Sequence, residues 1–113
     1  MKKIEIIVRP EVVDHLQDEL FAHGVRGMTV SPVQGAGNQR GFTEFYRGTE
    51  VLVQMRPKAK LEVVVADEDR IDEIVDIVFR VARSGEIGDG KIFILPVEEA
   101  IRIRTGERGT DAL

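Results

Sequence analysis

Two spacings of hydrophobic residues take turns along the chain. Residues 3–9 form a short run rich in isoleucine and valine, which predicts a strand. Similar runs occupy residues 28–33, 59–66 and 92–97. In two other segments the apolar residues recur at the spacing of one helix face. These residues are Val12, Val13, Leu16 and Leu20 in the first segment and Ile71, Ile74, Val75, Val78 and Ala82 in the second.

Residues that favour helix ends flank both helical segments. Pro10 suits a first helical turn, and Gly24 follows the last apolar residues of that segment. Asp67 or Asp69 can cap the second helix, which we expect to end at Gly85. Hydrophobic spacing and helix-end residues therefore suffice to place the boundaries of the predicted helices.

The order strand, helix, strand, strand, helix, strand predicts an α+β fold of the ferredoxin-like, split βαβ type (βαββαβ). Right-handed crossovers then place both helices on one face of an antiparallel four-stranded sheet. The chain of 113 residues has the size of one domain, and we expect a single domain over residues 1–113. Its last residues, about 106–113, are polar and are expected to form a loose tail.

The strand residues divide between two faces of the predicted sheet. One alternate set, Ile4, Ile6, Val8, Leu61, Val63 and Val65, suits the side covered by helices. The other set mixes charged and apolar residues: Glu5, Ile7, Lys60, Glu62, Val64 and Phe93. This mixed face is either ordinary exposed surface or a subunit interface. We favour the interface, because Ile7 and Val64 would otherwise face water together.

A long connection joins the second and third strands. It spans about residues 34–57, whereas neighbouring strands are usually joined by ~2–5 residues. A loop of this length is either a tolerated insertion or a functional segment. The loop contains Phe42, Tyr46 and Arg47, which are residue types that make contacts. We therefore predict an effector loop at about residues 36–56 that orders against a ligand or a partner.

Composition excludes several classes of protein. The net charge of −4 argues against a protein that binds nucleic acid by neutralising its phosphates. There is no cysteine, and hence no disulfide, thiolate metal site or thiol nucleophile. We found neither a signal peptide nor an apolar run long enough to span a bilayer, so we expect no membrane insertion and a cytoplasmic location.

Three short segments have the chemistry of a polyphosphate site. Gly88-Asp89-Gly90-Lys91 combines a flexible backbone with a cation, and glycines also open the long loop at Gly35 and Gly37. Arg102 and Arg104 alternate, so an extended segment would present both guanidinium groups on one side. Each segment alone is explained by a tight turn, or by a solvated strand with Ile101 and Ile103 packed inward. Together they favour phosphate binding.

Catalysis has little support in the sequence. His15 and His23 are eight residues apart and have no carboxylate partner at the spacing of a metal site. The acidic run at residues 67–73 is explained by the start of a helix. We therefore expect no enzyme. The alternatives are a slow nucleotide hydrolase that uses the same phosphate cradle and an RNA-binding module, which would need stacking aromatic residues on the central strands.

Seven segments spread along the chain match one known family. They are Met1–Ile4, Gly27–Val30, Gly35-x-Gly37-x-Gln39, Thr43–Glu50, Pro57–Glu62, Gly85–Phe93 and Ile101–Glu107. With these segments in this order, the chain resembles the PII nitrogen-regulatory signal proteins over nearly its whole length. The resemblance implies a homotrimer that binds ATP or ADP in the clefts between subunits, with 2-oxoglutarate bound together with Mg²⁺ and ATP. It also implies a long loop that docks on an ammonium transporter or on an enzyme or regulator of nitrogen assimilation.

The resemblance also assigns site residues by position. It places the adenine at Thr29 and Val64, the magnesium ion at Gln39 and a 2-oxoglutarate carboxylate at Lys58. It places Arg102 and Arg104 at the phosphates of a site shared with the neighbouring subunit. The phosphate cradle would comprise Gly37, Asn38, Gln39, Gly88, Asp89, Gly90 and Lys91.

The chain departs from the family pattern at two positions. Many relatives have arginine where this chain has Asn38, which removes one cation from the cradle. A regulator that responds to adenine nucleotides without 2-oxoglutarate is therefore an alternative. Val51 stands where many bacterial members have a modified tyrosine, so uridylylation at this position is chemically impossible. Modification of Thr49 or Tyr46 stays open.

Overall fold

The computed structural model describes residues 1–37, 44–46, 49–51 and 55–113. It contains two α-helices, α1 (Val13–Ala22) and α2 (Asp69–Ala82), among these residues. Its strands are β1 (Lys2–Val8), β2 (Thr29–Gly35), β3 (Glu44–Tyr46), β4 (Thr49–Val51), β5 (Arg56–Val65) and β6 (Lys91–Pro96). Short 3-10 helices at Pro10–Val12 and Gly109–Ala112 complete the described elements.

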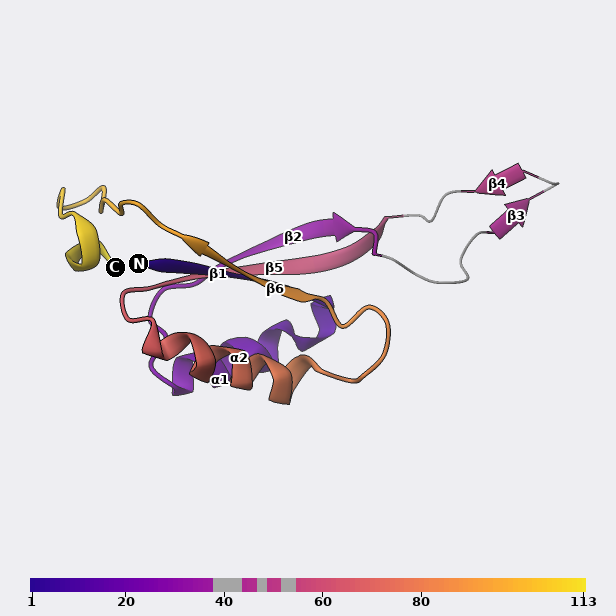
Figure 1. Cartoon of the computed structure of the whole chain (residues 1–113), viewed down its shortest axis with the longest axis horizontal. Helices are drawn as coiled ribbons and strands as arrows, with labels where there is room; N and C mark the ends of the chain where they lie inside the picture. Colours follow the sequence, from indigo (N-terminus) through magenta and orange to yellow (C-terminus); the bar gives the residue numbers. More distant parts are fainter. Residues whose placement is uncertain (38–43, 47–48, 52–54) are drawn as a thin grey trace.

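The main sheet has four antiparallel strands in the order β2-β5-β1-β6. Both helices lie against the same face of this sheet (Figure 1). The ferredoxin-like fold predicted from the order of elements is therefore confirmed. A strand turns successive side chains to opposite sides. Apolar residues therefore lie mainly on one face of the central strands β1 and β5, and this is the face that the helices cover.

The predicted core set is buried as expected. Ile4, Ile6 and Leu61 are fully buried on the helix side of the sheet. Leu16 and Leu20 of α1 pack there together with Ile74 and Val78 of α2. Ile77 is also buried, although it was not among the residues expected to form the apolar stripe of α2. The helix periodicity therefore identified the correct buried face of α2 but omitted one of its residues, Ile77.

The opposite sheet face is half-buried and charged along its middle. Glu5 of β1 lies directly opposite Glu62 of β5. Each carboxylate is paired along its own strand, Glu5 with Lys3 and Glu62 with Lys60, both at 3.1 Å. These lysines offset the repulsion expected between like charges that face each other across two strands. The apolar residues Ile7 and Val64 flank this charged band and are half-buried.

Strand β6 is apolar but lies at a sheet edge. Phe93 and Ile94 are 48% and 47% exposed, on opposite faces of the strand, and Leu95 is 37% exposed. An exposed apolar edge strand is a surface that another chain can cover. The edge position of β6 and the half-buried mixed face agree with the interpretation of an interface.

The long loop leaves the sheet where β2 ends and β5 begins (Figure 1). Within it, β3 and β4 pair antiparallel, with Glu44 opposite Val51 and Tyr46 opposite Thr49. These two strands were not predicted from the sequence, because runs of three residues are too short to show a period. Strand β5 also begins three residues earlier than predicted, at Arg56, because pairing with Gly35 extends it past Pro57.

The helices also begin or end at other residues than predicted. Residues 10–12 form a 3-10 turn, so α1 begins at Val13 rather than at Pro10. Helix α2 ends at Ala82, three residues before Gly85. Helix α2 has Glu68 at its N-cap, without a side-chain cap hydrogen bond, so the expected cap by Asp67 or Asp69 was wrong. The side chain of Asp67 instead accepts a hydrogen bond from the amide of Asp69, in the turn that leads into the helix. Among the described residues, no helix is long and apolar enough to cross a membrane.

Candidate functional site

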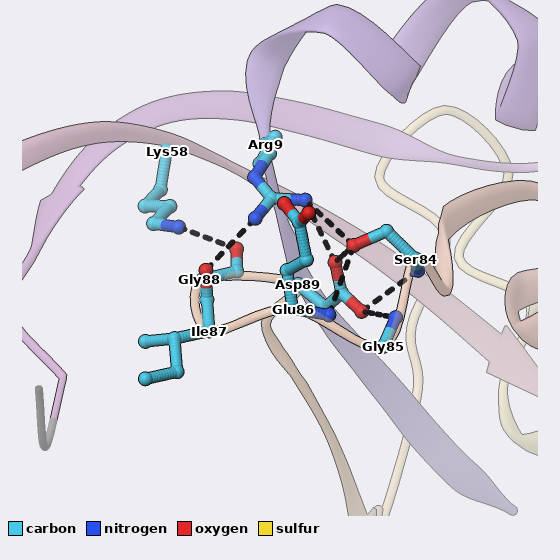
Figure 2. Close-up of polar contacts among 8 residues, drawn as sticks. All are labelled: Arg9, Lys58, Ser84, Gly85, Glu86, Ile87, Gly88 and Asp89. Atoms are coloured by element: carbon cyan, nitrogen blue, oxygen red, sulfur yellow. Dashed lines mark hydrogen bonds and ion pairs between the residues drawn. The ribbon is translucent and has the colours of Figure 1, made fainter.

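The loop between α2 and β6 is held by one arginine at the end of β1. Arg9 donates to the Asp89 carboxylate at 2.7 Å and to the carbonyl of Ile87 at 2.8 Å (Figure 2). The same carboxylate accepts hydrogen bonds from the amides of Ser84 and Gly85, each at 2.8 Å, and from the Ser84 hydroxyl. Arg9 therefore joins β1 to a segment about 80 residues away in the chain, and Asp89 closes the loop around its own side chain.

The hydrogen bonds on Asp89 also fix its charge. The Ser84 hydroxyl, helped by the amides of Ser84 and Gly85 and by Arg9, lowers the pKa of Asp89 from 3.8 to about 2. Hydrogen bonds to a carboxylate favour its charged form. Asp89 is therefore an anion at neutral pH, committed to holding the loop. It leaves Gly88, Gly90 and Lys91 as the groups of this segment that suit an anionic ligand.

The two glycines of this loop are required by the backbone. Gly88 and Gly90 have positive φ values of 101° and 106°. A Cβ at Gly90 would lie 1.7 Å from the carbonyl oxygen of Ile7, whereas a side chain at Gly85 would meet nothing within 4 Å. The loop at Gly90 therefore packs directly on the backbone of β1, and only glycine allows that approach.

A cavity of about 410 Å³ opens beside this loop. We call it the glycine-loop cavity. It is lined by Gly37, Lys58, Gly88, Gly90 and Lys91 of the predicted site, together with Ile7, Gly35, Ala36, Arg56, Ile87 and Phe93. Lys58 donates to the carbonyl of Gly88 at 2.7 Å, so its ammonium lies at the loop (Figure 2). The structure thus brings together five of the predicted residues, two of which are the cations Lys58 and Lys91, and adds Arg56 as a third cation.

Three other predicted site residues, Thr29, Val64 and Arg102, lie at the other end of the sheet. Thr29 and Val64 line a separate cavity of about 530 Å³, which we call the edge cavity. Thr29 and Gly35 are the two ends of β2, about 20 Å apart at the rise of a strand. Arg102 lies at the same end as Thr29, since it donates to the main-chain oxygen of Leu113, which lines the edge cavity. The predicted site residues therefore form two groups at opposite ends of the sheet.

The expectation for Arg102 and Arg104 was partly wrong. Residues 103–105 form a turn rather than an extended segment, because Gly106 has a φ of 74° and its amide donates to the carbonyl of Arg102 at 2.7 Å. Ile103 is fully exposed and Ile101 is 52% exposed, so neither packs inward. Residues 106–113, expected to be loose, form a hydrogen-bonded bend and a 3-10 helix.

Some predicted residues are not brought into view. Asn38 and Gln39, the second of which is the predicted magnesium ligand, lie outside the described residues. In the part of the chain that is described, no group of His, Asp or Glu side chains is arranged to hold a metal ion. Arg9 and Ser84 were not among the residues predicted from the sequence. The only available signal was a cation at the end of a strand and a serine at the end of a helix, which are both common.

Comparison with known proteins decides the family. A model of the family described as "Nitrogen regulatory protein P-II" matches residues 1–107. The chain belongs to the P-II family. It is 53% identical to the nitrogen regulatory protein P-II of Nostoc punctiforme and 52% identical to that of Synechocystis, over the full length of both chains. It is 51% identical to the P-II protein of Cereibacter sphaeroides, again over full length. Membership of the P-II family assigns this chain a role in nitrogen signalling and regulation.

The approach of Gly90 to β1 predicts a large effect of a single methyl group. Gly90→Ala should lower the free energy of unfolding by at least about 2 kcal/mol, through the clash with Ile7 and the positive φ. Gly85→Ala is the matched control, with a positive φ but open space, and should cost about 1 kcal/mol. Urea unfolding measures both. Equal losses in the two variants would contradict the close approach.

The low pKa of Asp89 predicts a pH-dependent contribution to stability. Because the folded-state pKa is below 3.8, the contribution is fully present above that pH and is lost as the pH falls toward about 2. Asp89→Asn should therefore be less stable than the wild type at pH 6, and the difference should shrink as the pH is lowered. Urea unfolding from pH 6 to pH 2 tests this. Glu86→Gln, a neighbouring exposed acid, is the control, and a constant difference for Asp89→Asn would contradict the assignment.

Proposed function

We propose that this protein is a homotrimeric sensor that binds ATP or ADP, and 2-oxoglutarate with Mg²⁺ and ATP, between its subunits. Through its long loop it regulates an ammonium transporter or an enzyme or regulator of nitrogen assimilation, in the cytoplasm. The observation that carries the proposal is the division of the predicted site residues between two cavities at opposite ends of one chain.

Two half-sites at opposite ends favour assembly in a ring. A heterologous contact sets one patch of a subunit against a different patch of its neighbour, and a ring closes when each subunit repeats that contact. In such a ring the glycine-loop cavity of one subunit would meet the edge cavity of the next. The exposed apolar residues of β6 and the half-buried mixed face supply the surface that such an assembly would cover.

The chemistry of the two cavities fits the two ends of a nucleotide. The glycine-loop cavity offers Lys58, Lys91 and Arg56 and a backbone with positive φ, which suits the phosphates. The edge cavity offers Val64, Met28 and Thr29, which suits a flat base that is apolar on its faces and polar at its rim. A magnesium ion would take oxygens from the phosphates and one from the amide of Gln39, as its preference for oxygen requires.

Lys58 connects the nucleotide to the second effector. Its ammonium lies 2.7 Å from the carbonyl of Gly88. A 2-oxoglutarate carboxylate beside the loop would draw this cation into a charge-assisted bond. The residues that line this cavity from Gly35 to Gly37 lead into the long loop. A ligand that contacts them in one loop conformation shifts the population toward that conformation.

The divided site predicts complementation between two inactive variants. Lys91→Ala removes a phosphate contact, and Thr29→Tyr fills the edge cavity without altering charge, so each homotrimer should lose ATP binding. Co-expression of the two variants at equal levels should restore ATP binding at about one quarter of the interfaces, those that pair two intact halves. Isothermal titration calorimetry on the purified mixture measures the recovered sites.

The outcomes of this complementation are distinct. Recovery of binding would place the two halves on different subunits. If the mixture of variants binds no ATP although the wild type does, the shared site is refuted. If the wild-type protein sediments as a monomer and takes up no ATP at millimolar concentration, the proposed function fails as a whole.

The position of Lys58 predicts selective loss of one effector. Lys58→Ala should weaken 2-oxoglutarate binding in the presence of Mg²⁺ and ATP by at least about tenfold, since a charge-assisted hydrogen bond is lost. ADP binding should be unchanged. Lys60→Ala, on the same face of β5 but paired with Glu62, is the control. Retained 2-oxoglutarate binding in Lys58→Ala would overturn this role. A wild type that binds ATP but no 2-oxoglutarate would support the alternative of a purely nucleotide-responsive regulator.

A further inference from the structure

The last turn of the described chain folds over the edge cavity. Gly109–Ala112 forms a short 3-10 helix, and Ala112 and Leu113 line the cavity together with Thr29 and Val64. Figure 1 shows this turn at the end of the sheet where the N-terminus lies, away from the loop between α2 and β6. Leu113 is 43% exposed, so a little over half of its surface is covered. An apolar side chain of this chain thus lies at the place that we assign to the base.

The same turn engages the cation that is expected to reach the phosphates. One terminal nitrogen of Arg102 lies 3.1 Å from a carboxylate oxygen of Glu107, and the other donates to the main-chain oxygen of Leu113 at 2.9 Å. Each terminal nitrogen of the guanidinium therefore holds an acceptor from within the chain. A polyphosphate that approached Arg102 would meet the carboxylate of Glu107 beside it, and the two anions would repel each other.

The backbone prepares this closure. The amide of Arg102 donates to the carbonyl of Glu107 at 2.9 Å, and the amide of Gly109 donates to the carbonyl of Ala100 at 2.9 Å. Gly106 and Gly109 have positive φ values of 74° and 68°, which allow the chain to reverse twice within four residues. The reversal returns Leu113 to the edge cavity. The contact of Leu113 therefore follows from a hydrogen-bonded bend.

We propose that residues 109–113 form a strap that competes with the nucleotide for the half-site of Thr29, Val64 and Arg102. The inference rests on the proposed function and adds a regulation of the same site. Leu113 imitates the apolar base, while the Glu107 carboxylate and the main-chain oxygen of Leu113 imitate the acceptor oxygens of a phosphate. The nucleotide binds only to molecules whose strap is open. The apparent affinity is therefore the intrinsic affinity multiplied by the fraction of molecules with an open strap.

One variant in the strap, one at Glu107 beside it and one control test this competition in the full-length, assembled protein. Leu113→Ser removes the apolar contact, and Glu107→Gln removes the anion at Arg102. Each should tighten the binding of Mg²⁺-ATP by roughly three- to tenfold, because the closed state is weakened. Asp111→Asn removes one negative charge from the same turn without touching the cavity, and its affinity should equal that of the wild type. Isothermal titration calorimetry measures all four proteins.

A second readout follows the strap itself. Hydrogen exchange of residues 109–113, measured by mass spectrometry on the wild type, should become faster when Mg²⁺-ATP is added, because the nucleotide displaces the strap. Slower exchange, together with weaker ATP binding by Leu113→Ser, would make the turn a wall of the site and overturn the competition. Equal affinities in all four proteins would also overturn it while leaving the proposed function intact. If the wild type itself binds no ATP, both proposals fail together.

Discussion

The ion pair between Arg9 and Asp89 is the interaction on which the glycine-loop cavity depends. Asp89 accepts hydrogen bonds from Arg9, from the Ser84 hydroxyl and from two amides, so the loop before β6 is closed by a single carboxylate. Arg9 in turn follows directly from β1, the strand against which Gly90 packs. The fold thereby fixes the positions of Gly88 and Lys91 before any ligand arrives, and preorganised groups bind at lower entropic cost.

The open face of the sheet gives the second constraint. The helices cover one face only, and the other combines ion-paired lysines and glutamates with half-buried Ile7 and Val64. Two cavities lie at the two ends of this arrangement, one lined by Lys58 and Lys91 and the other by Thr29 and Val64. Under the proposed function these cavities are the two halves of one site, which can meet only between subunits, and association in a ring would also cover the apolar edge strand β6.

A carboxylate pairs with a cation near each of the two cavities. Asp89 pairs with Arg9, and Glu107 pairs with Arg102. The two carboxylates have different consequences. Asp89 holds the loop in place without occupying Gly88, Gly90 or Lys91, and so supports the candidate site. Glu107 contacts Arg102, the cation that we propose for the phosphates, and the turn that follows Glu107 extends to the edge cavity.

The sequence by itself determined the fold class and the buried face, because hydrophobic spacing reports directly which side of a helix or strand leaves water. Ile4, Leu61 and Ile74 were assigned to the core from spacing alone. The family followed from seven short segments, although no single one specified it.

Only the tertiary structure decided where the candidate residues lie relative to one another. Lys58 and Gly88 are 30 residues apart and in contact, whereas Thr29 and Gly35 belong to one strand and serve different cavities. The bend at Gly106 was likewise not predicted, since the alternation of Arg102 and Arg104 is typical of a strand. The hydrogen bonds across the turn that prevent an extended segment are seen only in the structure. Contacts between distant segments arise from packing and pairing that a local pattern does not encode.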